Sequence, residues 1–263
     1  MTAVLVDSHC HLDFPELAPQ LDSVLALMRQ NKVARALCIS VKLEDFPQVR
    51  ALAENHAELY GAVGVHPDYE NVTEVSIARL VELAGHPRII GIGETGLDYY
   101  RLQGDLEWQR NRFRTHIRAA RECGKPLIVH TRSAAADTLR IMREERAGEA
   151  RGVMHCFTES WEVASEAMEL GFYISFSGIV TFKNAQALKE VARKVPLERM
   201  LIETDSPYLA PVPFRGKVNE PGLVKHVAEE IARLRGVPFE VIAGATTKNF
   251  HELFRTEHDE STP

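Results

Sequence analysis

The sequence predicts an α/β protein of the TIM-type (β/α)8 barrel class, and three observations support this prediction. Short apolar or β-branched runs recur along the chain, and eight of them can be counted. A longer amphipathic stretch follows most of these runs, which is the pattern of repeated βα units with a parallel sheet. The chain has 263 residues, of which 45% are hydrophobic, and barrels of about 250 residues commonly fold as one domain.

The predicted strands are listed first, in chain order: Val4 to Asp7, Ala36 to Ser40, Tyr60 to Val65, Ile89 to Gly93, Pro126 to Val129, Gly152 to His155, Tyr173 to Ser177 and Met200 to Glu203. The predicted helices are Leu17 to Gln30, Phe46 to His56, Ile77 to Gly85, Leu106 to Cys123, Ala134 to Arg146, Trp161 to Leu170, Ala185 to Lys194 and Phe239 to Phe254. Residues 1–254 are expected to form this single domain, and residues 255–263 a frayed tail. A doubly wound sheet is the alternative, but the glycines of Gly91 to Gly96 lack the dinucleotide-binding spacing.

Composition narrows the classes of function. No stretch approaches the roughly 20 apolar residues of a membrane span, and the N-terminus lacks a signal-peptide pattern, so a cytoplasmic protein without a membrane partner is expected. A net charge of -6 argues against a broad nucleic-acid-binding surface. The four cysteines, with no Cys-x-x-Cys pair, are interpreted as reduced core residues. No obligate protein partner is evident.

Two histidines follow the first predicted strand closely. His9 and His11 are two residues apart, so on an extended chain their side chains project from the same face, and Cys10 faces the opposite side. A His-x-His pair is a weak signal by itself, because incidental histidines are equally common. The pair gains meaning from the residues that end the other strands.

Metal-binding residue types end most of the predicted strands. Barrel enzymes bring the carboxyl ends of their strands together in one active site. Five of the eleven histidines lie at such ends, and buried histidines and carboxylates are costly unless they are paired or bind a metal. The residues in question are His9, His11, His66, Glu94, His130, His155 and Asp205.

The number of candidate ligands predicts two divalent ions. A catalytic zinc usually has three protein ligands, and six side chains exceed that number. We expect His9, His11 and Asp205 on one ion, His130 and His155 on the other, and Glu94 as the bridge. Two ions about 3.5 to 4 Å apart can generate a hydroxide and neutralise charge on a phosphodiester. The mixed ligand set accommodates zinc, manganese, cobalt or nickel, and it could function with magnesium.

These residues resemble the TatD family of metal-dependent deoxyribonucleases within the amidohydrolase superfamily. The motifs are Val6 to His11, Gly64 to Pro67, Ile92 to Asp98, Pro126 to His130, His155 to Phe157 and Glu203 to Pro207. The resemblance implies a (β/α)8 fold, divalent metals on the six ligands and 3′ to 5′ exonuclease or related phosphodiesterase activity. It also places His66 near the substrate phosphate. Many amidohydrolases use a carboxylated lysine as the bridge, whereas this chain offers Glu94, which fits the TatD subgroup.

The candidate catalytic residues are therefore Glu94, Asp205 and His66. Glu203, two residues before Asp205, is expected to orient a ligand histidine from behind. Candidate contacts to the phosphates of a DNA end or a small phosphodiester are Arg132, Arg215 and Lys217.

Three other functions remain open from the sequence. The same metal site could hydrolyse a lactone, a cyclic amide or a phosphotriester, because the fold does not choose the electrophile. A non-catalytic metal-dependent binding protein is a second alternative, although a degenerate relic should have lost a ligand. A general nucleic-acid-binding module is the third, and the acidic balance disfavours it.

Overall fold

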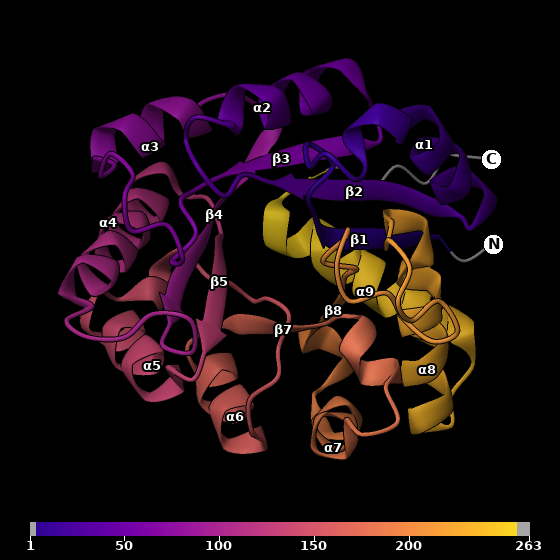
Figure 1. Ribbon diagram of the computed structural model, residues 1–263. Coiled ribbons are helices and arrows are strands. Elements are labelled where there is room, and N and C mark those ends of the chain that lie inside the picture. Colours follow the sequence, from indigo (N-terminus) through magenta and orange to yellow (C-terminus); the bar gives the residue numbers. More distant parts are fainter. Residues whose placement is uncertain (1–3, 257–263) are drawn as a thin grey trace.

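The computed structural model describes residues 4–256, in which eight parallel strands form a nearly closed barrel (Figure 1). The strands pair in chain order, each with the next, so the predicted (β/α)8 fold is confirmed. Their bounds are Leu5–Cys10 (β1), Val33–Ile39 (β2), Leu59–Val63 (β3), Ile89–Asp98 (β4), Leu127–Arg132 (β5), Gly152–Met154 (β6), Phe172–Phe176 (β7) and Met200–Ile202 (β8). Most of the tail expected to be frayed, residues 257–263, lies outside the described residues.

Helices surround the barrel in Figure 1, and α9 lies across one end of it. Their bounds are Leu21–Gln30 (α1), Phe46–Asn55 (α2), Ile77–Ala84 (α3), Glu107–Cys123 (α4), Ala135–Glu144 (α5), Trp161–Glu169 (α6), Gln186–Lys194 (α7), Val224–Arg235 (α8) and Phe239–Phe254 (α9). Helix α8 is not among the predicted helices. Its buried residues Val224, Val227, Ala228 and Ile231 nevertheless have the spacing of an amphipathic helix.

The core has two layers because successive strand residues alternate between the two faces of the sheet. Leu5, Leu127 and their equivalents pack against the surrounding helices. The next residue of each strand, such as Val6 and Ile128, points into the barrel. Phe250 and other residues of α9 complete this inner layer. One end of the barrel is thus closed by apolar side chains, and the polar side chains gather at the other end.

The barrel closes between β1 and β8 through main-chain hydrogen bonds. The Asp205 N–H donates to the His9 carbonyl at 2.9 Å, and the His11 N–H donates to the Ser206 carbonyl at 2.9 Å. Cys10 and Ser206 form a parallel bridge between these two bonds. The seam therefore fixes the backbone of His9, His11 and Asp205 directly.

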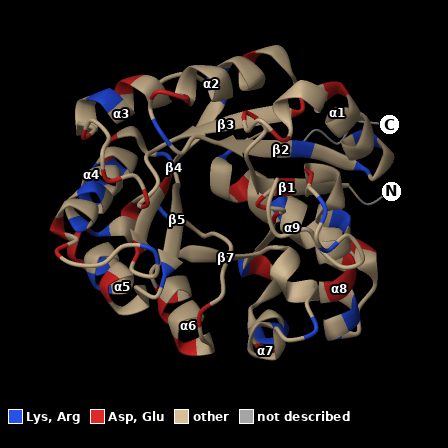
Figure 2. Cartoon of the chain, viewed as in Figure 1, with Lys and Arg blue, Asp and Glu red and all other residues tan. Residues whose placement is uncertain are grey.

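The outer surface in Figure 2 shows basic and acidic residues interspersed over the helices, without separation into a basic face on this side. Within residues 4–256, no helix is long and apolar enough to cross a membrane. All four cysteines are free thiols; Cys10 and Cys38 are buried, and Cys123 and Cys156 are partly exposed.

Candidate metal centre

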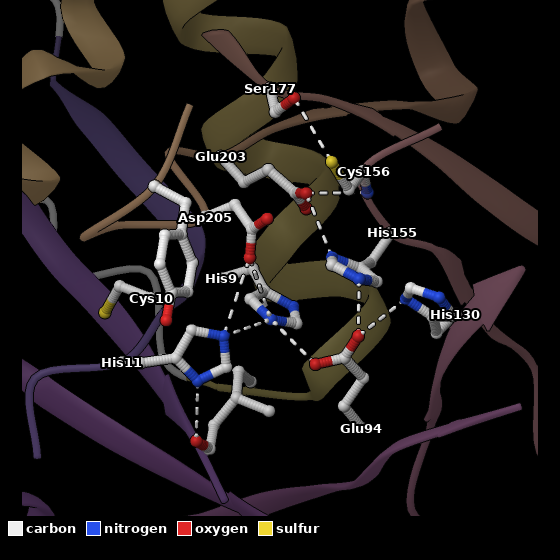
Figure 3. A network of polar contacts seen from close by, with 12 residues as sticks. His9, Cys10, His11, Glu94, His130, His155, Cys156, Ser177, Glu203 and Asp205 are labelled. Atoms are coloured by element: carbon white, nitrogen blue, oxygen red, sulfur yellow. Dashed lines mark hydrogen bonds and ion pairs between the residues drawn. The ribbon is translucent and has the colours of Figure 1, made fainter. Parts of the chain in front are cut away.

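Three residues from β1 and the end of β8 converge at the seam; we call His9, His11 and Asp205 the β1/β8 cluster (Figure 3). The Nε2 atoms of His9 and His11 lie 3.2 Å apart. Asp205 Oδ1 lies 3.7 Å from His9 Nε2 and 3.5 Å from His11 Nε2. His11 Nδ1 donates to the Ile39 carbonyl at 3.1 Å, so its Nε2 lone pair faces the other two residues.

A second group lies beside the first; we call His66, Glu94 and His130 the β3–β5 cluster. Glu94 Oε1 lies 3.0 Å from His130 Nδ1, 3.3 Å from His66 Nε2 and 2.7 Å from His155 Nε2. Its other oxygen, Oε2, lies 3.5 Å from His9 Nε2. One carboxylate thus contacts both clusters, which is the position expected of a bridge.

Register shifts aim the side chains of β1 and β4 into the centre. In β1, a shift between Asp7 and Cys10 turns His9 and His11 toward the barrel axis. Cys10 then points away from the site, which is the orientation that the sequence predicts. Its thiol donates a hydrogen bond to the Leu37 carbonyl. A second register shift, in the pairing of β4 with β5, lies between Ile92 and Thr95 and therefore includes Glu94.

Two glycines of β4 allow this strand to approach β5 closely. Gly93 and Gly96 have φ values of 145° and 140°, which side-chain-bearing residues rarely adopt. A Cβ atom at Gly96 would lie 2.0 Å from the His130 carbonyl oxygen, and one at Gly93 would lie 2.6 Å from that of Ile128. The close approach brings Glu94 next to His130.

Buried carboxylates behind the site hold two of the histidines. His155 Nδ1 donates to Glu203 Oε1 at 3.1 Å, and the Cys156 N–H donates to the same oxygen at 2.6 Å. His130 Nε2 donates to Asp98 Oδ2 at 3.0 Å. In both rings the other nitrogen is left to face Glu94, as carboxylate partners of metal-binding histidines arrange it. Glu203 therefore contacts His155 from behind, and Asp98 contacts His130 in the same way.

His66 has the opposite arrangement. Its Nδ1 accepts the N–H of Asp68 at 3.1 Å, so the proton of the neutral ring is assigned to Nε2. That Nε2–H points toward Glu94 Oε1 at 3.3 Å. His66 is thus built as a hydrogen-bond donor, whereas His11, His130 and His155 each have toward the site the ring nitrogen that a cation would use.

The ionisable groups stabilise one another's charged forms. Burial alone would raise the pKa of Glu94, but the neighbouring rings of His155, His66 and His130 hold it well below the usual value. Burial opposes ionisation of His155 too, yet Glu94 and Glu203 raise the pKa of this ring well above its usual value. Asp205 shows the pattern of Glu94: burial is outweighed by His11, His155 and His9, and its pKa is lowered.

The donor set fits a divalent cation. Imidazole nitrogens and carboxylate oxygens from six strands or strand ends gather at the site, and these are the ligand types that zinc and related metals select. Several buried polar atoms of the described residues lack a hydrogen-bond partner, and three of them belong to His9 (Nδ1), His155 (Nε2) and Glu203 (Oε2). Of these three, His155 Nε2 is the atom that faces Glu94. His155 Nε2 is close to Glu94 but not in hydrogen-bonding geometry. Buried polar atoms are normally satisfied, and a ligand atom without a protein partner is what a cation would use.

The site opens into a cavity of about 510 Å³. Its wall includes the site residues, the aromatic rings of Phe14, Tyr69 and Tyr208, and two arginines. Of the described residues, Arg101 and Arg132 line this cavity, whereas Arg215 and Lys217 do not. Arg215 instead lies over the Phe182 ring, 3.6 Å from its centre, and Lys217 lies beside Phe214. Sequence reasoning missed Arg101 because nothing local distinguishes it from a solvated loop residue.

Helix α4 braces the loop that carries His66. Gln109 donates to the Pro67 carbonyl, Arg112 donates to the Tyr69 carbonyl, and His116 Nε2 accepts the Val65 N–H at 3.1 Å. All three α4 side chains are buried. The three residues lie along one face of α4. This buried face therefore carries polar side chains in addition to the apolar ones expected of an amphipathic helix.

Asp7 braces the seam. Its carboxylate accepts the Thr204 N–H at 2.8 Å, the Thr204 hydroxyl at 2.6 Å and the His9 N–H at 3.3 Å. Asn219 in turn donates to the Thr204 carbonyl at 3.0 Å. Asp205 follows with a φ of 57°, a left-handed conformation that directs its side chain into the site. No feature of the sequence signals this network in advance.

Comparison with known proteins gives consistent matches over the whole chain. The profile of the family described as TatD related DNase matches residues 6–255. The uncharacterized metal-dependent hydrolase YcfH of Escherichia coli K12 is 47% identical over 256 residues, which cover 96% of each chain. The uncharacterized metal-dependent hydrolase YabD of Bacillus subtilis 168 is 43% identical and covers 96% of this chain and 99% of its own.

Solved structures agree. The crystal structure of YJJV, a TatD homolog from Escherichia coli K12, has a TM-score of 0.90 at 30% identity and covers 98% of this chain and 100% of its own. A variant described as an organophosphate-hydrolysing enzyme engineered from a weak promiscuous lactonase has a TM-score of 0.63 at 16% identity, covering 96% of each chain. The second similarity extends to the fold alone.

Proposed function

Because the chain belongs to the TatD family of metal-dependent hydrolases, we propose that it cleaves phosphodiester bonds and removes nucleotides from DNA ends in the 3′ to 5′ direction. One observation carries this proposal. Glu94 contacts histidines of both clusters, and the site around it opens into a cavity lined by Arg101 and Arg132. Guanidinium groups suit phosphate oxygens, and they supply locally the positive charge that the chain lacks overall.

The proposed ligands follow from the geometry of the two clusters. His9, His11 and Asp205 would hold one divalent ion. His130 and His155 would hold a second, because a nitrogen of each ring lies within 3.0 Å of Glu94 Oε1, although His155 also lies close to His9 and Glu203. Glu94 would bridge them, one oxygen toward each cluster. When bound, such ions supply positive charge that polarises a phosphate and lowers the pKa of a water molecule. Zinc, manganese, cobalt, nickel and magnesium are all compatible with the donor types.

The protein's own groups then orient the substrate and accept a proton. Because His66 Nδ1 accepts the Asp68 N–H, the proton of the neutral ring lies on Nε2. This Nε2–H would donate to a phosphate oxygen of the substrate. Asp205, whose pKa is lowered, is ionised at neutral pH and can accept the proton of the attacking water. Arg101 and Arg132 bind the phosphates that follow along the strand.

The test begins with metal-free protein reconstituted with each divalent ion separately. Single-stranded DNA labelled at its 3′ end should release labelled mononucleotide at once, whereas DNA labelled at its 5′ end should shorten in steps. A lactone, a cyclic amide and a phosphotriester are assayed in parallel. Faster turnover of one of these esters or amides than of DNA would overturn the proposed substrate.

A matched control separates hydrolysis from binding alone. Salt-dependent titration of metal-free protein with single-stranded DNA measures binding without turnover. Metal-loaded protein that binds DNA but releases no nucleotide with any of the ions would support a binding protein instead.

A further inference from the structure

His130 lies between two carboxylates of the same strand. Its Nδ1 is 3.0 Å from Glu94 Oε1, and its Nε2 is 3.0 Å from Asp98 Oδ2. Glu94 and Asp98 are four residues apart in β4, so both side chains face the site. Asp98 is 1% exposed, and it is not among the predicted site residues.

The second oxygen of Asp98 holds the turn that follows β4. Oδ1 accepts the N–H of Tyr100 at 2.9 Å and the N–H of Arg101 at 3.0 Å. Gln109 of α4 fixes the backbone of Asp98, since its Oε1 accepts the Asp98 N–H and its Nε2 donates to the Asp98 carbonyl. Arg101 extends from this turn to the wall of the cavity.

We propose that Asp98 is a positioning residue that couples the metal site to the substrate-binding wall: Oδ2 sets the ring of His130 with Nδ1 as its ligand atom, and Oδ1 sets the turn that carries Arg101. The inference rests on the proposed two-ion site. It adds a residue that acts through His130 and Arg101 and touches neither ion nor substrate.

Hydrogen-bond donors and acceptors determine the ring's protonation. A carboxylate can only accept, so His130 presents Nε2–H to Asp98 and, with no cation bound, Nδ1–H to Glu94. A cation shared with Glu94 would displace the Nδ1 proton, so the neutral ring would keep its proton on Nε2 and offer a lone pair on Nδ1. That lone pair faces Glu94, where a shared cation would lie. Carboxylate partners of this kind fix the tautomer and orientation of ligand histidines.

The substitution Asp98→Asn inverts this tautomer while keeping the side chain's shape. The two N–H groups of Tyr100 and Arg101 require an oxygen, so the amide nitrogen must face His130 Nε2. Nε2 then accepts, and the proton moves to Nδ1, which can no longer bind a metal. Because the turn keeps its acceptor, the position of Arg101 should be preserved.

We expect calorimetric titration of metal-free protein with zinc to resolve a tight and a weaker ion in the wild type. Asp98→Asn should weaken one of the two ions by about 10- to 100-fold and leave the other within about threefold. In zinc-saturated protein, ¹⁵N NMR of the His130 ring should show the proton on Nε2 in the wild type and on Nδ1 in Asp98→Asn.

Two further variants separate the two roles. Asp98→Ala should weaken the same ion and also raise KM for a dinucleotide, because the turn loses its acceptor. Arg101→Ala should raise that KM without changing either zinc affinity. Asp105→Asn removes a charge from the same loop, where its side chain is 87% exposed, and should change none of these quantities.

The outcomes decide between a coupling role and a general structural one. Equal weakening of both ions in Asp98→Asn, together with lower thermal stability, would show that Asp98 only supports the fold. Wild-type zinc affinities, or a proton that stays on Nε2, would also overturn the proposal. If the wild type binds a single ion or none, the proposed two-ion site itself fails, which is a separate result.

Discussion

The β1/β8 cluster is attached to main-chain hydrogen bonds that close the barrel, whereas the β3–β5 cluster is held by side chains that reach it from α4 and β4. At the seam, Asp205 N–H and His9 C=O bond directly. On the other side, Asp98 holds His130, and Arg112 donates to carbonyls around His66. Closure of the barrel therefore positions the first cluster, whereas the second depends on the pairing of β4 with β5 and on bracing side chains from β4 and α4.

The exposure of the histidines differs in the same sense, whereas the carboxylates reverse it: the side chain of Asp205 is 17% exposed and that of Glu94 is 4% exposed. The side chain of His9 is fully buried and that of His11 is 5% exposed, while His66 and His130 are 15% and 17% exposed. Substrate approaching through the cavity meets the β3–β5 cluster with its Nε2–H donor and nearby arginines. The two histidines of the seam side are therefore the more enclosed ones, and those of the cavity side are the first that a substrate entering the cavity would meet.

Glu94→Gln tests the link between the clusters and should have the largest effect. The amide keeps the size of the side chain but removes the charge that both clusters share, so we expect hydrolysis to fall by at least ~100-fold with the fold intact. Activity and metal content measured together check this. Glu240→Gln, an exposed glutamate of α9, is the matched control and should behave as wild type. Near-normal activity at full metal occupancy would sink the bridging assignment.

Asp7→Ala tests how far the seam depends on one side chain. The substitution leaves the buried Thr204 N–H and hydroxyl without their acceptor, so the free energy of unfolding should fall by about 3 kcal/mol. Metal affinity at the β1/β8 cluster should fall with it. Asp7→Asn retains an acceptor oxygen and should lose less than half as much, as measured by urea unfolding. Equal losses in both variants would contradict the hydrogen-bond explanation.

His116→Gln tests the bracing of the β3–β5 cluster by α4 through its pH dependence. Burial lowers the pKa of His116 to about 4, from 6.5 in the unfolded chain. The unfolded state therefore binds more protons between these two values, and stability falls as pH decreases through that window. Protonation of His116 in the unfolded state should therefore lower the free energy of unfolding of the wild type by about 2 kcal/mol as the pH falls from about 7.5 to about 5.

The glutamine variant should lack this contribution, so the difference between its urea unfolding curves and those of the wild type measures it. Asn111→Gln, at an exposed position of the same helix that carries no ionisable group, provides the comparison and should leave the pH dependence unchanged. A wild-type pH slope in His116→Gln would show that another group loosens this side of the barrel.

Sequence alone predicted the barrel and the residues at its polar end because both depend on local signals. Short apolar runs, each followed by an amphipathic stretch, predict βα units, and parallel barrel strands must end at one rim. Asp98 was also within reach, since it lies four residues after Glu94 on the same face of a strand. Its omission reflects the bounds chosen for that strand, which runs to Asp98 and not to Gly93.

Other features depend on interactions between distant residues, which no local pattern reports. The shift in β1 that aims His9 and His11 appears only when β2 pairs with it. The hydrogen bonds of Gln109 and His116 join α4 to a loop more than 40 residues away in sequence. Arg215 and Lys217 were chosen by charge and loop position, and a loop's path is set by what it packs against.

Substitution of Arg215 and Lys217 should have the smallest effect, and it tests whether phosphate binding extends beyond the cavity. Both side chains are exposed, and Arg215 lies over Phe182 outside the cavity wall. A dinucleotide that occupies the cavity should not reach them, so its KM should be unchanged by Arg215→Ala with Lys217→Ala.

A long oligonucleotide passes the cavity's edge, and there the double variant should raise KM by less than about threefold. It should also flatten the salt dependence of binding by roughly 0.7 in log-log slope for each ion pair with a phosphate that the substitutions remove. The reference is Arg101→Ala with Arg132→Ala, which should raise KM for both substrates by about tenfold, the size of one charged hydrogen bond. A larger effect from the loop pair than from the cavity pair would reverse the comparison, because the substrate would then be held mainly on the seam side. Equal loss on both substrates from the loop pair would instead show that this loop supports the metal site.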